Sequence, residues 1–542
     1  MVFGEESLTK KKVIIYPVFV FLYPVLSLWA QNVRDISPSQ VYRALLISVL
    51  LGILLWLISW LVIRRWDKAA LIVSVAFLLV FSYGHFFNFL DQWNNNLAHH
   101  KVALPIYGCL MLTWGWVVLK NNKNIELWIS MFKVIAPALL LLPVYTLGST
   151  MIINTNREKS PAPEVAKIES QNQHPDIYYI ILDAYGREDM LRKYYGYDNS
   201  AFINYLKDTG FYIADQGRSN YISTVLSLSS SLNMQYVDAL LPEADPHTSD
   251  TIQLAGYETD LLDLIHHSYV RSFLAEHGYR LITYDNNFKT TAHDADVLLS
   301  YSSLSPRNGH NEKETGLVVN SFEGLLLETS LARLWVDWQT AHGMENIVIE
   351  SPYLAHRALT IDMFESLKEI PAMEGDNFVF MHFLVPHPPF VFGPNGEMSR
   401  HDQAFTLSDG TNYSGTPRSY IKGYTEQVTY INQYLEETIN YIINNSQTPP
   451  IIIIQGDHGP RMGVNFKNPQ KIDLDGHFGN LNAYYLPNVD HTALYSTITP
   501  VNSFRVVFNS CFGTKFELLP DESYLSTSIE PFDFVNVTDL IK

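Results

Sequence analysis

The chain has 542 residues, a formal net charge of −18 and only two cysteines. That length exceeds what a single core usually organises, so at least two domains are expected. The acidic balance argues against a nucleic-acid partner. The cysteines, Cys109 and Cys511, lie far apart in the sequence, which excludes a disulfide framework.

The first 150 residues contain five apolar segments, each about the length needed to cross ~30 Å of hydrocarbon as a helix. They cover residues 13–30, 44–63, 69–90, 102–119 and 127–147. The first begins with basic residues but has no small-residue cleavage site, and further segments follow it. We interpret it as an anchor rather than a removed signal peptide. Residues 1–150 are therefore predicted to form a five-helix transmembrane anchor.

Basic residues predict the orientation of this anchor. Lysines occupy positions 10–12 before the first segment, Arg64 and Arg65 lie between the second and third, and Lys120 and Lys123 lie between the fourth and fifth. The alternate loops hold fewer basic residues, which predicts a cytoplasmic amino terminus. Five crossings then place the rest of the chain outside. The segments contain no paired charges that would suggest an ion path, which disfavours a transporter.

The remaining chain divides into a linker and a large exported domain. Residues 151–172 are polar and contain Pro161 and Pro163, which is linker composition. Residues 173–542 alternate short apolar runs with helical patterns. This alternation predicts an α/β domain with a mostly parallel sheet covered by helices on both faces.

Two predicted strands of this domain end in acidic residues. The run 177–182 is followed by Asp183, and four isoleucines at 451–454 lead into Asp457 and His458. Such β-branched runs are typical of strands buried on both faces. Ligands of open α/β sheets bind beyond the carboxyl ends of the strands, and Asp and His can serve one metal ion together. The alternative is a solvated turn in which Asp457 caps the next helix.

A hydroxyl-rich segment at 219–234 predicts a helix that begins near Thr224. The first turn of that helix would offer free backbone N–H groups and its positive end to an anion. A hydroxyl at this position can attack a substrate or bind a metal. The alternative is that Ser223 or Thr224 is only an N-cap.

Three further stretches contain side chains that suggest a role in the site or in packing. In the stretch 378–390, His382 alternates with apolar residues and suits a core, whereas His387 lies in a proline-containing loop past the strand. His477 opens the segment after the second acidic strand. An amphipathic stretch at 315–345 is interpreted as packing against a core or a partner helix.

Taken together, these motifs resemble the alkaline phosphatase/sulfatase superfamily, in particular its membrane-anchored sulfatase-like branch. That branch includes lipoteichoic acid synthases and phosphoethanolamine transferases. The likeness covers roughly residues 173–500, and the five-segment anchor matches the branch as well. The motifs that carry it are the strand ends at Asp183 and at Asp457-His458-Gly459, the TxxS pattern from Thr224 to Ser227, and Pro386-His387-Pro388.

The resemblance implies a divalent metal ion, which could be zinc, manganese, magnesium or calcium. The implied ligands are Asp183, Thr224, Asp457 and His458. Thr224 would also be the nucleophile, with Ser223 as the remaining alternative. His387 and His477 would act at the transferred group or at the leaving and attacking oxygens.

The implied protein is a membrane-bound sulfatase-like hydrolase or transferase of the cell envelope. It would sit in a bacterial-type plasma (inner) membrane with its catalytic domain in the periplasm or outside the cell. Its partners would be the lipid bilayer and a membrane phospholipid or envelope glycan, whose phosphate-linked group it moves through a covalent threonine intermediate. Formylglycine sulfatases carry a Cys or Ser in a CxPxR context, and Thr224 departs from that pattern. The alternatives are a phosphodiesterase, phosphatase or sulfuric ester hydrolase that uses water, and an inactive envelope scaffold on the same fold.

Overall fold

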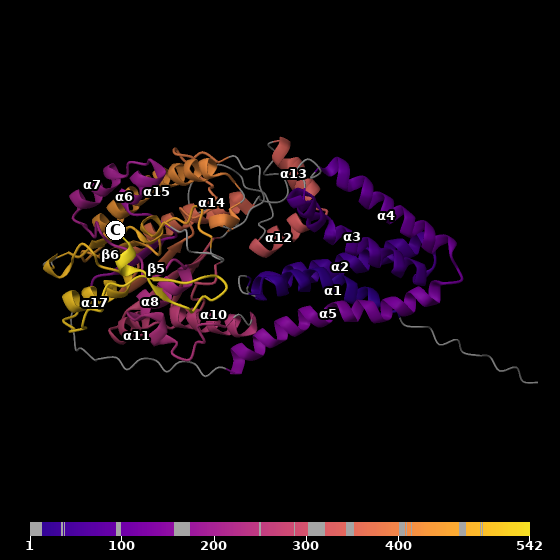
Figure 1. The fold of residues 1–542 in the computed structure, drawn as a ribbon, viewed down its shortest axis with the longest axis horizontal. Helices are drawn as coiled ribbons and strands as arrows, with labels where there is room; N and C mark the ends of the chain where they lie inside the picture. The colour runs from indigo at the N-terminus through magenta and orange to yellow at the C-terminus, as the bar shows by residue number, and fades with distance from the viewer. Residues whose placement is uncertain are drawn as a thin grey trace, which may run out of the picture. The chain divides into compact units, whose positions relative to one another are not determined.

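A computed structural model gives the fold of the chain (Figure 1). It describes residues 14–33, 36, 38–93, 99–156, 174–248, 251–286, 288–301, 320–342, 352–399, 407, 409–413, 415–465, 473–487, 489 and 491–541. Contacts divide the chain into two compact units. The first, here called the membrane unit, comprises Met1–Ile152 and Val319–Ser351, and the second comprises Ile153–Val318 and Pro352–Lys542 and is called the exported unit after its predicted location. The amphipathic stretch predicted at 315–345 thus falls largely with the N-terminal helices, and not with the exported domain in which the sequence pattern placed it.

The membrane unit contains the five helices that the sequence predicts, together with two helices from the later segment. They are α1 (Tyr16–Gln31), α2 (Pro38–Ile63), α3 (Trp66–Trp93), α4 (His100–Lys120), α5 (Ile125–Asn156), α12 (Ser321–Thr329) and α13 (Arg333–His342). Among the described residues, four helices, α2 to α5, are long and apolar enough to cross a membrane, judged by length and composition. The described part of α1 has 16 residues. A crossing by α1 and the orientation of the bundle stay predictions.

Burial distinguishes the helices of the membrane unit. Val20, Phe21 and Val25 of α1 are fully buried, so this helix packs among its neighbours. In contrast, α2, α4 and α5 leave many large aliphatic side chains exposed, including Leu112 and Leu142. An apolar surface of this extent is what a lipid-facing bundle requires.

The exported unit contains a seven-stranded sheet in the order β2-β7-β6-β1-β5-β3-β4. The strands are β1 (Ile177–Leu182), β2 (Tyr212–Ile213), β3 (Arg280–Asp285), β4 (Val297–Ser300), β5 (Asn377–Phe383), β6 (Ile451–Gly456) and β7 (Asn482–Tyr485). The pairs β6-β1, β1-β5, β5-β3 and β3-β4 are parallel, and only β7 and β2 join antiparallel. The predicted α/β class with a mostly parallel sheet is confirmed.

The central strand β1 explains why its sequence is a continuous apolar run. Its residues alternate between two hydrophobic clusters: Tyr178, Ile180 and Leu182 belong to one, and Ile177, Tyr179 and Ile181 to the other. Both faces of the strand are buried, so both sets must be apolar. Burying each such side chain contributes roughly 1.5–3 kcal/mol.

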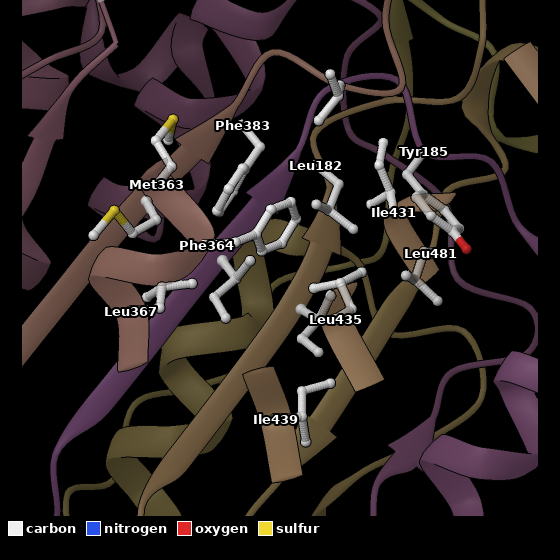
Figure 2. Close-up of a cluster of buried hydrophobic side chains, with 14 of the residues drawn as sticks. Leu182, Tyr185, Met363, Phe364, Leu367, Phe383, Ile431, Leu435, Ile439 and Leu481 are labelled. Carbon is white, nitrogen blue, oxygen red and sulfur yellow. The ribbon is translucent and has the colours of Figure 1, made fainter. Parts of the chain in front are cut away.

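Helices cover both faces of the sheet (Figure 1). On one face lie α6 (Glu188–Tyr195), α7 (Ser200–Thr209), α14 (Pro352–Glu369) and α15 (Pro417–Asn445), and on the other lie α8 (Thr224–Asn233), α10 (Thr251–His266), α11 (Tyr269–Glu276) and α17 (Pro500–Cys511). Figure 2 shows Phe364 of α14 beside Phe383 of β5, where the rings stack with centroids 4.3 Å apart. The short helices α9 (Val237–Leu240) and α16 (Leu474–Phe478) and the hairpin β8 (Tyr524–Leu525) with β9 (Val535–Asn536) complete the described exported unit.

Candidate metal centre

The three central strands deliver the predicted site residues to one edge of the sheet. In the parallel register, Leu182 at the end of β1 pairs with Gly456 of β6 and with Phe383 of β5. Asp183 and Asp457 are the next residues after two of these ends, so they leave the sheet at the same level. Because all three strands are parallel, their carboxyl ends form a single crevice.

Asp457 is held by backbone donors on one of its two oxygens. The N–H groups of Ala184 and His458 donate to Oδ1 at 3.0 and 2.9 Å. Ala184 has a φ of 62°, in the left-handed region that a non-glycine residue seldom adopts. The turn after β1 thus points its N–H at Asp457. The other oxygen, Oδ2, is left to face the centre of the crevice.

His458 presents one ring nitrogen to the same place. Its Nδ1 lies 2.9 Å from the carbonyl of Gly459, which can only accept, so Nδ1 carries the proton. The lone pair of Nε2 is therefore available, and Nε2 lies 3.3 Å from Asp457 Oδ2 and 3.7 Å from Asp183 Oδ1. Burial, as the largest cause, lowers the pKa of this imidazole, which favours the neutral form that a metal ligand requires.

Asp183 is fully buried and stays ionised. Burial alone would raise the pKa of its carboxyl, but His387, His382 and His458 outweigh burial and hold the pKa well below its usual range. His382, on β5, places Nε2 3.5 Å from Asp183 Oδ2 and has Nδ1 within 2.9 Å of Thr290 Oγ1. His382 is therefore buried in its strand, as the sequence predicts, and it also faces the crevice.

Thr224 reaches the crevice from the first turn of α8. Its Oγ1 lies 3.4 Å from His458 Nε2, and the side chain is buried. Ser223 is the N-cap residue of α8 but accepts no capping hydrogen bond through its side chain. The structure thus brings the hydroxyl of Thr224 to the imidazole of His458, which in turn lies beside the two carboxylates. The expected roles of Thr224 and of the three other residues as ligands stay predictions.

The chemistry of these side chains fits a divalent cation. Asp183 Oδ1, Asp457 Oδ2 and His382 Nε2 are buried and have no hydrogen-bond partner among the described residues. Donor atoms of Asp183, Asp457 and His458 all lie within 4.8 Å of one another. Leaving two ionised carboxylates buried without a cation costs several kcal/mol. Two carboxylates, one imidazole and a hydroxyl suit zinc, manganese, magnesium or calcium.

A second cluster of polar side chains, formed by His387, Arg461 and Asp409, lies beside these residues. Its Nδ1 is 2.6 Å from the carbonyl of Pro388, and its Nε2 is 2.9 Å from Arg461 Nη2. The same ring nitrogen lies 3.5 Å from Asp409 Oδ2, so His387 Nε2 faces both a guanidinium and a carboxylate. Arg461 also lies 3.3 Å from Asp409 Oδ2. Burial would raise the pKa of the Asp409 carboxyl, but His387 and Arg461 together hold it below its usual value.

His477 lies next to the segment that follows β6. Its Nδ1 is 2.6 Å from the carbonyl of Pro460, so Nδ1 carries the proton and Nε2 has a free lone pair. Burial lowers the pKa of this imidazole. The described residues show no direct contact between His477 and Thr224, Asp183 or Asp457. The role predicted for His477 therefore stays a prediction.

Helix α15 forms hydrogen bonds to the two turns that border the crevice. The hydroxyl of Tyr424 donates to the carbonyl of Ala184 at 2.8 Å and accepts from the N–H of Gly186 at 3.1 Å. Gln427 accepts from Val391 at 2.7 Å and donates to the carbonyl of His387 at 3.3 Å. The two turns that carry Asp183 and His387 are thus fixed by one helix face.

The sequence analysis missed two residues, Arg461 and Asp409. Arg461 follows Asp457-His458-Gly459 by two positions, and a basic residue so close to a predicted anion site is a signal that could have found it. Asp409 lies in a loop far along the chain, and no local pattern marks it. The reason for a glycine at position 459 also appears only in the three-dimensional structure. A Cβ there would lie 2.6 Å from the carbonyl oxygen of Gly476 and 2.8 Å from that of His477, which is too close for any other residue.

A family model described as Sulfatase matches residues 175–496 of the chain. This match confirms the predicted resemblance, and with it the prediction of an enzyme of the sulfatase-like class. No curated protein matches the sequence.

Several solved structures are weakly similar to this chain, and three of them illustrate the range. The C-terminal periplasmic domain of EcEptC from Escherichia coli in complex with zinc is 10% identical, with a TM-score of 0.41, covering 69% of this chain and 95% of that one. The integral membrane lipooligosaccharide phosphoethanolamine transferase A from Neisseria meningitidis is 12% identical, with a TM-score of 0.39, covering 91% and 94%. The lipoteichoic acid synthase LtaP from Listeria monocytogenes is 12% identical, with a TM-score of 0.37, covering 66% and 76%. Similarities this low carry no conclusion about the substrate of this chain.

Proposed function

The chain belongs to the sulfatase family, whose model covers more than half of it, and we propose that it is a membrane-bound metalloenzyme that moves a phosphate-linked group on an envelope lipid or glycan. Thr224 would be the nucleophile, and Asp183, Thr224, Asp457 and His458 would hold a divalent ion. The observation that carries the proposal is the meeting of these four side chains in one buried crevice, where two carboxylate oxygens have no protein partner.

The side chains fit the steps of a double displacement. Thr224 Oγ1 forms a bond to phosphorus while the bond from phosphorus to the donor's oxygen breaks, and an acceptor alcohol or water then displaces Thr224. When bound, a divalent ion supplies positive charge that favours the alkoxide and offsets charge on the phosphoryl oxygens. Arg461 would donate hydrogen bonds to those oxygens. In each displacement His477 Nε2, which has a free lone pair, would take the proton of the attacking hydroxyl and return it to the leaving oxygen.

The membrane unit favours a donor that resides in the membrane. In the part of the chain that the structure describes, four helices are long and apolar enough to span it, and a protein anchored in this way meets lipid headgroups at high local concentration. A lipid donor in turn favours transfer to an acceptor over simple hydrolysis. Hydrolysis by water is the second candidate, because water can displace the threonine from phosphorus in the same way as an acceptor alcohol.

The test uses purified full-length protein in vesicles of phosphatidylethanolamine and phosphatidylglycerol, with a soluble chromogenic phosphodiester as a second substrate. We expect release of diacylglycerol from one of the lipids, and loss of this release and of phosphodiester cleavage in Thr224→Ala. Ser223→Ala is the matched control, because it removes the neighbouring hydroxyl, and it should keep both activities.

Mass spectrometry of the protein after acid quenching should show a phosphate-linked adduct on the peptide that contains Thr224. An adduct on Ser223, or full activity in Thr224→Ala, would contradict the proposed nucleophile. Activity that appears only with water as acceptor would select the hydrolase.

A further inference from the structure

Helices α12 and α13 are an insertion that leaves the exported unit and packs in the membrane unit. In the sequence they lie between β4 and α14, both of which belong to the exported unit. The chain consequently passes between the two units three times: after Ile152, before Val319 and after Ser351. A single linker would suffice to anchor an exported domain, so the return of residues 319–351 to the membrane unit suggests a separate function.

The insertion packs against the bundle through an apolar seam. Phe322 of α12 is fully buried in a cluster with Val25 and Leu28 of α1. Leu331 and Leu334 pack against a second cluster formed by α3 and α4, whose buried members are Tyr83, Leu90 and Ala103. At Gly84 of α3 the two backbones approach so closely that an added Cβ would lie 2.1 Å from the carbonyl oxygen of Glu328.

Polar contacts fix both ends of the insertion. At one end Glu323 of α12 pairs through both carboxylate oxygens with Arg43 of α2. Asn320, which caps α12, donates to the carbonyl of Gln40 at 2.8 Å. These two contacts fix the start of α12 against the start of α2.

At the other end, Asp337 of α13 lies 2.9 Å from Nε2 of His100, whose Nδ1 lies 2.8 Å from the hydroxyl of Tyr83. Arg333 lies over the ring of Phe87 at 4.2 Å and donates to Asn88 at 2.5 Å. Contacts at both ends hold the insertion in one position on the bundle.

All of these contacts lie at one end of the bundle. They involve the last turns of α1, the first turns of α2, the second half of α3 and the first turn of α4. In the predicted orientation, with the amino terminus in the cytoplasm, these are the outer ends of the four helices. The insertion comes from the exported part of the chain, and it docks on the side where that part is predicted to lie.

Tryptophan is confined to this unit. All ten tryptophans of the chain belong to the membrane unit, and two of them, Trp335 and Trp338, lie in the insertion. Each of these two is 43% exposed, and their rings lie one turn apart on α13 with centroids at 5.5 Å. Tryptophan is enriched where a protein meets the lipid headgroups, because its ring is apolar and its N–H is polar.

We propose that α12 and α13 form an interfacial anchor that lies in the headgroup layer of the outer leaflet, with Trp335 and Trp338 in contact with phospholipid. The exposed pair lies on the helix whose neighbouring residues Leu331 and Leu334 pack against α3 and α4 at their predicted outer ends. The anchor holds the exported unit at the membrane through a second attachment, independent of the linker after α5. This inference does not depend on the proposed catalytic chemistry.

The test measures the depth of a nitroxide label in the full-length protein in phospholipid vesicles. Cys109 and Cys511 are replaced by alanine, and the label is attached in Trp338→Cys. The matched control is Tyr441→Cys on α15 of the exported unit, where the native side chain is also 43% exposed. We expect the label at 338 to collide several-fold more with oxygen than with a water-soluble nickel complex, relative to the label at 441. Equal ratios at the two positions would overturn the proposal.

Two further variants keep the test decisive. Trp335→Cys should report the same depth as Trp338→Cys, and it replaces the latter if that variant does not fold. Gly84→Ala should displace α12 and lower the oxygen preference at 338, whereas Gly115→Ala on α4, whose added Cβ meets nothing within 4 Å, should leave it unchanged. The oxygen preference of the label at 338 should persist in Thr224→Ala. A failure of the proposed catalytic function would therefore not change this result. An unchanged depth in Gly84→Ala would contradict the packing of α12 against α3.

Discussion

Two regions of this molecule place charged side chains in apolar surroundings, and they satisfy those charges differently. In the membrane unit, Arg43 and Glu323 neutralise each other within the protein. At the sheet edge of the exported unit, Asp183 and Asp457 each have a buried oxygen without a partner among the described residues. A paired charge thus marks a contact between helices, whereas a buried carboxylate oxygen without a protein partner is what a proposed cation site would require.

The two regions also differ in how much free energy their charged groups contribute. The side chain of Arg43 is 48% exposed, so its pairing with Glu323 contributes only about 0–1 kcal/mol, and the docking of α12 must depend mainly on the apolar seam around Phe322. The carboxylates at the sheet edge are fully buried, and their unpaired state is correspondingly costly. The effect of a substitution should therefore be far larger at the sheet edge.

The largest effect is expected from Asp183→Asn. This change keeps the shape of the side chain but removes a charge that the crevice leaves unpaired, so the metal site and the activity should both be lost. We expect kcat to fall by about 10³-fold or more on both the lipid and the soluble phosphodiester. Asp189→Asn, at an exposed position paired with Arg187, is the control and should be active. Near-normal turnover in Asp183→Asn would show that the unpaired carboxylate does not mark the site.

A smaller effect is expected from Arg461→Gln. The guanidinium is a largely buried positive charge that interacts with Asp183 and Asp457, and it is held by Asp409 and His387. Its loss should lower kcat/KM by about 10- to 100-fold through weaker binding of the phosphoryl oxygens. Arg461→Lys should recover only part of the activity, because the forked geometry is lost. Steady-state kinetics on the soluble phosphodiester separate these outcomes; an unchanged kcat/KM in Arg461→Gln would assign Arg461 to structure alone.

The third prediction concerns His356 of α14, which is buried in the exported unit. Burial, with a smaller contribution from His387, lowers the pKa of this imidazole from about 6.5 to about 4. Between these values the unfolded chain binds a proton that the folded chain does not, so stability must fall as the pH drops through this window. From pH 7 to pH 5 the loss should be about 2 kcal/mol.

Thermal unfolding of the full-length protein at both pH values measures this loss, and His356→Gln should show a shallower pH dependence than the wild type. The same slope in both proteins would mean that His356 titrates alike in the folded and unfolded chains.

The smallest effect is expected from weakening the insertion's charge pairs with Glu323→Gln and Asp337→Asn together. Because exposed pairs contribute little, the fold should persist, and cleavage of the soluble phosphodiester should be unchanged. Turnover of the vesicle-borne lipid should fall by about 3- to 10-fold, because the exported unit loses part of its second attachment to the membrane. An equal loss on both substrates would mean that these charge pairs affect catalysis itself and not the attachment to the membrane.

The sequence predicts the sheet edge well because the signals there are local. The apolar runs of β1 and β6 must be buried on both faces, and the residue that follows each run must then leave the sheet at its edge. Asp183 and the pair Asp457-His458 could be placed by this argument, and Thr224 by the start of its helix. The strands β1, β5 and β6, the start of α8 and the five N-terminal helices follow from periodicity and length, whereas the sequence pattern does not predict β4.

The remaining features depend on contacts that periodicity does not encode. Asp409 reaches His387 and Arg461 from a loop with no local signature. The amphipathic pattern around Leu331 and Trp335 predicts a helix with one apolar face, but it does not say which surface that face will cover. Its docking on α3 and α4 could be found only in three dimensions.

The central claim is that the unpaired carboxylates at the sheet edge hold a metal ion, and elemental analysis of the purified full-length protein tests it most directly. We predict at least one tightly held divalent ion per wild-type chain, its loss in Asp457→Asn and its retention in Asp189→Asn. Wild-type protein that contains no divalent ion after supplementation, or Asp457→Asn protein that keeps the wild-type amount, would contradict the account.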